Sequence, residues 1–124
     1  MAKYFYLAVR KISDDYDGDA SLIWKGKPKS ALVIRRFLEF EGVGPKIATM
    51  AANILVRVFK VPMSDLSAID ISADRRVMKY FTEQRLLRPK AKKEELIYLA
   101  RELYPKYPGI LDVAAFQGGQ ALRG

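Results

Sequence analysis

Two glycines and a lysine in one short turn could bind an anion. Gly42 and Gly44 stand two residues apart, directly before Pro45 and Lys46. Both glycines can adopt positive φ and let another backbone approach closely. Proline suits the first position of a helix, where its missing N–H matters least. We therefore expect a helix start whose outward amides and dipole bind a phosphate, with Lys46 adding a positive charge.

The composition removes several other kinds of site. The chain contains no His and no Cys. Disulfides, zinc clusters and cysteine-held iron–sulfur clusters are therefore excluded, as are catalytic triads built on either residue. Any general base must be Asp, Glu, Lys or Tyr. We expect no metal site and no cofactor.

The overall charge favours a polyanionic partner. Among 124 residues, 22 are Lys or Arg and 14 are Asp or Glu, which gives a formal charge of +8. Neutralising phosphates releases counterions, so such a chain is suited to nucleic acid, although the charge could also serve solubility alone. No apolar run approaches the roughly 18 residues of a membrane span, and no signal peptide is visible. We expect no membrane partner and a cytoplasmic location, with the DNA.

The apolar periodicity predicts an all-α domain of five to six helices that spans residues 1–124. Gly18 should end the first helix, Asp19 should cap a short turn, and Ser30 should be the N-cap of the helix before the glycine turn. Either Ser72 or Asp74 should start a later helix. No alternating strand pattern of useful length is visible. The expected helices cover 3–15, 31–40, 45–60, 72 or 74 to 81, 92–104 and 110–122.

The same spacing predicts which side chains form the core. The helix before the turn should bury Leu32, Phe37, Leu38 and Phe40, with Arg35 and Arg36 exposed. The helix after it should bury Ile47, Met50, Ala51, Ile54, Leu55 and Val58. We interpret Trp24 and Tyr16 as core residues, with a base-stacking platform as the alternative.

The segment from Phe40 to Ala48, with both flanking helices, resembles the helix-hairpin-helix motif. The hairpin would span residues 30–59. In that family the hairpin grips the DNA backbone without reading its sequence. The resemblance implies phosphate contacts from Gly42, Val43, Gly44 and Lys46. The alternative is an ordinary helical corner with a glycine turn.

A longer stretch is similar to the endonuclease III-like DNA glycosylases. Lys46 stands where the lyases of that family carry their nucleophile, and residues 69–81 resemble the segment with the catalytic aspartate. Ungapped comparison puts Asp74 at that aspartate, and Asp70 is the competing candidate. The resemblance implies that the amine forms a Schiff base at a sugar C1′, next to a carboxylate that stabilises the developing charge. Arg75 and Arg76 are further candidates for phosphate contact.

The chain also departs from the family pattern. An Arg at 75 or 76 replaces the family's His, and Ala73 replaces a Val. The C-terminal stretch 118–122 has no Cys, so the family's iron–sulfur cluster is absent. Only 45 residues precede Lys46, where the family has several further helices. Activity could therefore require a second copy of the chain or a separate subunit.

Three functions remain open on the sequence. The leading hypothesis is a base-excision DNA repair protein, a glycosylase and abasic-site lyase with Lys46 and Asp74 as catalytic residues. The first alternative is a non-catalytic DNA-binding module, in which Lys46 only contacts phosphate and Asp74 only caps a helix. The second is an interaction protein whose exposed apolar helices dock a partner. The damaged base that an enzyme would choose is not encoded in any motif we find.

Overall fold

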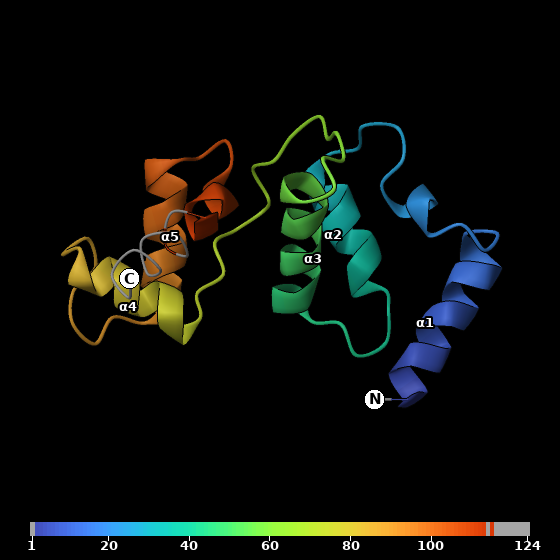
Figure 1. Ribbon diagram of the computed structural model, residues 1–124, viewed down its shortest axis with the longest axis horizontal. Coiled ribbons are helices and arrows are strands. Elements are labelled where there is room, and N and C mark those ends of the chain that lie inside the picture. The colour runs from blue at the N-terminus through green and yellow to red at the C-terminus, as the bar shows by residue number, and fades with distance from the viewer. Residues whose placement is uncertain (1, 114, 116–124) are drawn as a thin grey trace. The chain divides into compact units, whose positions relative to one another are not determined.

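A computed structural model describes residues 2–113 and 115, and it confirms the predicted all-α class. Within these residues the only pairing of extended backbone is an isolated parallel bridge between Lys29 and Asp65. Residues 111–113 are helical, and most of the final helix predicted over 110–122 lies outside the described residues. The elements in Figure 1 are α1 (Ala2–Asp15), the 3₁₀ turn η1 (Ala20–Ile23), α2 (Ser30–Leu38), α3 (Pro45–Arg57), α4 (Arg75–Glu83), α5 (Lys93–Leu103) and the 3₁₀ turn η2 (Pro108–Ile110).

The chain divides into two compact units, Met1–Ala68 and Ile69–Gly124, and each is described by itself. The prediction of one domain stays a prediction. None of the described helices combines the length and the apolar character that crossing a membrane requires.

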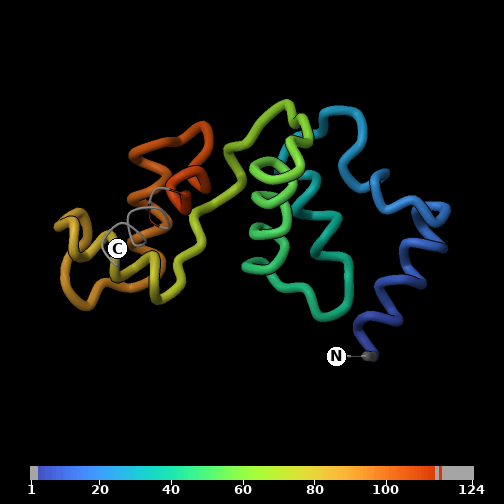
Figure 2. The backbone as a smooth tube through the Cα atoms, in the orientation of Figure 1, coloured from blue at the N-terminus to red at the C-terminus, as the bar shows by residue number. Residues whose placement is uncertain are grey.

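In the first unit, α2 and α3 run side by side in opposite directions (Figure 2). The buried side chains between them are small, because Val33, Ala48 and Ala52 have no exposed surface. Alanines at positions i and i+4 occupy the same helix face and let two backbones approach closely. Arg36 joins this pair to η1, since its guanidinium donates to the carbonyl oxygen of Ile23 at 2.8 Å.

The predicted core of α3 was largely wrong. Leu55 is buried, but the larger apolar side chains of the helix are exposed, from 37% to 62%: Ile47, Met50, Ile54 and Val58. The helix turns its alanine face toward α2, because close packing of two helices favours small side chains there over high hydrophobicity. On α2, Phe40 is buried at the following turn as predicted, whereas Leu38 is exposed and Arg36 is half-buried.

The helix ends follow local capping rules in most places. Gly18 ends α1 with φ +78° and donates to the carbonyl oxygen of Ile12 at 3.0 Å. Asp19 caps η1 by accepting from the Ser21 N–H. Ser30 was predicted to cap α2, but Lys29 is the N-cap residue and its side chain makes no capping bond. The buried Ser30 hydroxyl instead accepts from the Ala68 N–H at 3.1 Å, which ties the long connector after α3 to the start of α2.

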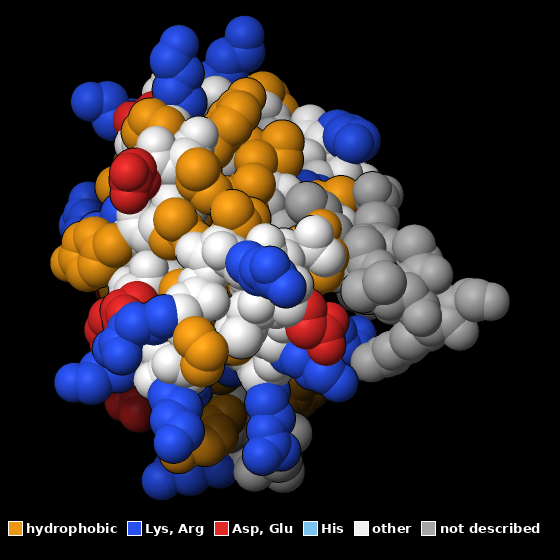
Figure 3. Space-filling model, turned by 90° about the vertical axis from the view of Figure 1, so that its left-hand side faces the viewer, with side chains coloured by type: hydrophobic (Ala, Val, Ile, Leu, Met, Phe, Trp, Pro, Cys, Tyr) orange, Lys and Arg blue, Asp and Glu red, His pale blue; other side chains and the backbone are white. Residues whose placement is uncertain are grey.

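In the second unit, α4 and α5 build a separate apolar core. Its buried members are Ile71, Val77, Phe81, Leu87, Leu96, Ala100 and Ala115. A bidentate ion pair joins Arg88, in the connection between α4 and α5, to Glu95 on α5. Arg88 Nε donates to Oε1 of Glu95 at 2.7 Å, and Nη2 donates to Oε2 at 2.9 Å. The hydrogen bonds from Arg88 and from the Lys92 N–H lower the pKa of Glu95 to about 2. On the face drawn in Figure 3, hydrophobic side chains gather in a band with Lys and Arg at its margins.

Candidate nucleic-acid interface

The glycine turn between α2 and α3 lies at the surface. Gly44 is the N-cap residue of α3, and Pro45 is its first residue, as predicted. The first hydrogen bond of the helix runs from the Ala48 N–H to the Gly44 carbonyl oxygen at 3.0 Å. The amides of Lys46 and Ile47 therefore precede the helical ladder, and both residues are exposed. Two amides at the positive end of the helix dipole are thus available to an anion.

Only one of the two glycines uses its conformational freedom. Gly42 has φ +83°, in the left-handed region, whereas Gly44 is extended with φ −95° and ψ −179°. Gly44 does not use that freedom, because an N-cap residue normally takes the extended conformation. The Val43 amide, a predicted phosphate contact, donates inside the turn to the Phe40 carbonyl oxygen at 3.2 Å. The amides available to an anion are therefore those of Lys46 and Ile47, in the first turn of α3.

Helix α1 packs against the Gly42 side of the turn. A Cβ atom added to Gly42 would lie 2.9 Å from Cγ of Tyr4. Further along the same helix, the Lys11 amine lies 5.7 Å from the centre of the Phe40 ring. A hydrogen bond to Asp15 raises the pKa of that amine. Sequence reasoning missed this neighbour, because nothing in the aromatic run 4–6 indicates that one ring covers a glycine almost forty residues away.

Replacing Gly42 with alanine is expected to destabilise the first unit by about 1–3 kcal/mol. A non-glycine residue with positive φ costs roughly 1–2 kcal/mol, and the contact with the Tyr4 ring adds to it. Gly44→Ser is the control, because Gly44 has open space around it and no positive φ, and serine is favoured at a helix N-cap. Urea denaturation followed by circular dichroism measures both variants. Equal stability of the two would show that neither the backbone nor Tyr4 restricts residue 42.

Lys46 is the second residue of α3, and its side chain is exposed. Within the described residues, its amine makes no ion pair or hydrogen bond. It stands beside the amides of the helix start. An amine in this position can contact a bound phosphate, and in its neutral form an amine is also a nucleophile.

Both candidate carboxylates have structural roles in the second unit. Asp74 is half-buried and caps α4, with Oδ1 accepting from the Val77 N–H at 2.9 Å. Its Oδ2 makes no hydrogen bond within the described residues. Asp70 accepts two hydrogen bonds from Arg101, both at 2.8 Å, which raise the pKa of that guanidinium. Of the two, Asp74 keeps an oxygen free for chemistry.

The predicted site residues fall into two groups, one in each unit. The glycine turn and Lys46 belong to the first unit, and Asp74 belongs to the second with Arg75 and Arg76. Arg75 and Arg76 are the first two residues of α4 and are exposed. Each group thus combines an exposed helix start with basic side chains. Across the described part of the chain, no three His, Cys, Asp or Glu side chains gather where they could hold a metal ion.

Comparisons with protein-family models, with curated proteins and with solved structures found no match for this chain. The resemblance to helix-hairpin-helix proteins therefore stays an expectation from the residues of the hairpin and of the segment 69–81.

Proposed function

We propose that this chain is a base-excision DNA repair protein that binds the DNA backbone through its hairpin and reacts with abasic sites through Lys46. The observation that supports this proposal is the exposed start of α3. There the backbone amides of Lys46 and Ile47 and the side-chain amine of Lys46 lie within one helical turn and are unpaired among the described residues. The chain as a whole carries a formal charge of +8. Such a protein would work inside the cell, with the DNA.

The proposed binding step uses the helix start as a phosphate clamp. The Lys46 and Ile47 amides would donate to phosphate oxygens, and the dipole of the 13-residue helix α3 would favour the negative charge. The Lys46 ammonium would add a charge-assisted contact. These contacts position the strand but carry no sequence information. At the start of α4, the guanidinium groups of Arg75 and Arg76 would contact phosphates through charge-assisted hydrogen bonds.

The proposed reaction begins when the neutral Lys46 amine attacks C1′ of an open-chain abasic sugar. A C–N bond forms, the aldehyde oxygen leaves as water, and the product is a protonated Schiff base. Loss of a proton from C2′ then sends an electron pair toward C1′, and the 3′ phosphate leaves by β-elimination. On a damaged nucleotide, the same amine would first displace the base, which must be flipped out of the stack.

In this proposal, Asp74 supplies a carboxylate through its free oxygen. Oδ1 stays on the Val77 amide and fixes the side chain, which leaves Oδ2 available. A carboxylate that assists the amine would stabilise positive charge at C1′ and accept a proton from the amine.

A non-catalytic DNA-binding module is the second candidate. Asp74 caps α4 and Asp70 holds Arg101, so both carboxylates have a purpose in the fold without any reaction. In that case Lys46 serves as a phosphate contact alone.

DNA affinity measured over a range of salt concentrations tests the shared binding step. Fluorescence anisotropy with a duplex that carries a stable abasic-site analogue should show log affinity falling linearly with log salt, because each phosphate contact contributes about 0.9 to the slope. Lys46→Ala should lower the slope by about 1. Lys106→Ala is the control, because Lys106 is exposed and lies outside both groups. An affinity that does not change with salt would contradict binding through phosphate contacts, and it would favour the alternative of an interaction protein.

A further inference from the structure

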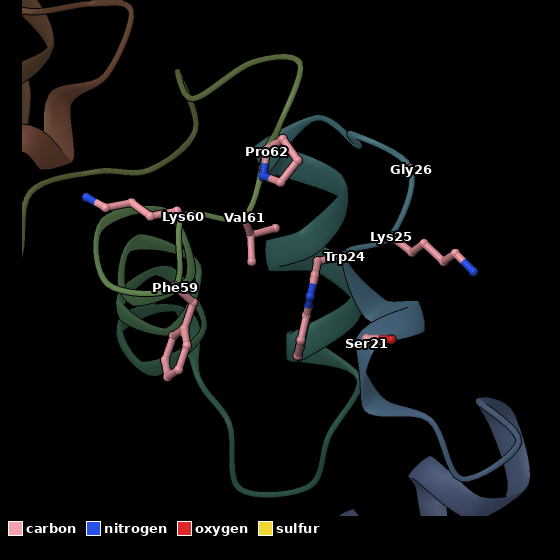
Figure 4. Close-up of a pocket in the computed structure, with 8 residues that line it drawn as sticks. All are labelled: Ser21, Trp24, Lys25, Gly26, Phe59, Lys60, Val61 and Pro62. Atoms are coloured by element: carbon pink, nitrogen blue, oxygen red, sulfur yellow. The ribbon is translucent and has the colours of Figure 1, made fainter.

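A cleft of about 410 Å³ opens in the first unit, away from the start of α3. One wall is formed by the segment from η1 to the following loop, and the other by the residues directly after α3 (Figure 4). The Trp24 and Phe59 rings stand on opposite sides of the opening. A volume of this size lies within the range of small-molecule sites, roughly 300–1,000 Å³. The lining residues are Ser21, Trp24, Lys25, Gly26, Phe59, Lys60, Val61 and Pro62.

Backbone hydrogen bonds hold the two walls in place. The Ser64 N–H donates to the Pro28 carbonyl oxygen at 3.0 Å, and the Ser30 N–H donates to the backbone carbonyl oxygen of Asp65 at 2.9 Å. These bonds join the loop that follows Trp24 to the connector that follows Phe59. The Val61 N–H is fixed on the Leu55 carbonyl oxygen at 3.0 Å. A ligand between the walls would therefore find most of the cleft already formed, which reduces the entropic cost of binding.

The two rings differ in accessibility. Phe59 is 68% exposed, whereas Trp24, interpreted from the sequence as a core residue, is half-buried. The indole N–H of Trp24 makes no hydrogen bond within the part of the chain that the structure describes. Two aromatic rings that line one opening are suited to stacking on a flat ligand.

The charges around the cleft indicate the class of ligand. Lys25 and Lys60 line it, their side chains extend outward on its two sides, and no Asp or Glu is among the lining residues. The nearby Asp19 carboxylate is engaged by the N–H and hydroxyl of Ser21. A flat aromatic ligand with negative charge on both sides fits this arrangement. An unpaired base between two phosphates has both features.

We propose that the Trp24–Phe59 cleft binds an unpaired nucleobase of single-stranded nucleic acid, with Lys25 and Lys60 contacting the phosphates on either side. This site goes beyond the proposed repair function, because it requires neither an abasic sugar nor Lys46. It would let the chain hold a single-stranded segment as well as the backbone at the hairpin.

The fluorescence of Trp24, the only tryptophan of the chain, reports directly on this site. Titration with an eight-nucleotide oligothymidylate should quench it in a saturable way. A base-free strand of the same length and charge should quench it far less, because stacking requires the base. Phe59→Ala should weaken the oligothymidylate affinity about 5- to 150-fold, the equivalent of losing one stacked base. Phe59→Tyr keeps the ring and should retain the affinity.

Three controls make the titration decisive. Phe5→Ala removes another exposed aromatic ring, from α1, and should leave the affinity unchanged. Phe59→Ala should leave the affinity for the abasic-site duplex unchanged, so this site can fail while the hairpin proposal holds, and the reverse. Circular dichroism checks that each variant is folded. Equal quenching by the base-free strand, or unchanged oligothymidylate affinity of folded Phe59→Ala, would each overturn the proposal.

Discussion

Borohydride reduction of this protein with abasic-site DNA is expected to yield a covalent complex, and Lys46→Ala is expected to yield none. Borohydride reduces a Schiff base to a stable amine, so trapping reports the covalent intermediate directly. Removing the nucleophile removes the covalent route, and we expect the trapped fraction to fall by at least about 10³-fold. Gel electrophoresis of radiolabelled DNA under denaturing conditions measures the complex.

Lys46→Arg separates reaction from binding. Arginine keeps the positive charge at the second position of α3 but stays protonated, so it cannot form a Schiff base. This variant should bind abasic DNA nearly as well as the original chain and should give no trapped complex. Unchanged trapping in Lys46→Arg would mean that another amine reacts, and the lyase proposal would then be wrong.

The same assay separates the two carboxylates. Asparagine caps helices about as well as aspartate, so Asp74→Asn should preserve α4 while removing the charge. If Asp74 assists the amine, trapping should slow by about 10²- to 10⁴-fold, the usual contribution of a general acid or base. Trapping at the original rate in Asp74→Asn would leave Asp74 as a helix cap only.

Leu96→Ala is expected to cause a large loss of stability in the second unit, about 2–5 kcal/mol. Leu96 on α5 has no exposed surface and lies in the core shared with Val77 and Phe81 of α4. Removing its side chain loses hydrophobic transfer energy and leaves a cavity that close-packed neighbours fill only in part. Because Val77 also supplies the amide that holds Asp74, the variant should loosen that carboxylate as well.

Urea denaturation and hydrogen exchange measure this effect. Amide protection should fall in α4 and α5, the helices that build this core. Leu86→Ala is the matched control: Leu86 lies in the same unit, is 52% exposed, and should change the stability by less than about 0.5 kcal/mol. A similar loss in both variants would mean that burial at position 96 does not decide the stability of this unit.

Much of the helical framework could be predicted from the sequence, because helix ends depend on neighbours a few residues away. Pro45 begins α3, Gly18 ends α1, and Asp19 and Asp74 accept from amides two or three residues further on. These interactions are local, so the residue type and its spacing are sufficient to predict them. The chain has no His and no Cys, and this limit on the available chemistry also follows from the sequence alone.

The tertiary structure alone decided which surfaces meet. The prediction that α3 buries its larger apolar residues was wrong, because α2 packs on Ala48 and Ala52. The preference for small side chains at this contact depends on how closely the two helices approach. The Ser30 hydroxyl accepts a hydrogen bond from the N–H of Ala68, 38 residues away, which no capping rule can predict. Likewise, the contact of Tyr4 with Gly42 and the cleft between Trp24 and Phe59 join segments distant in the chain. Such contacts depend on how packed elements fill space, and the periodicity of a single helix does not contain that information.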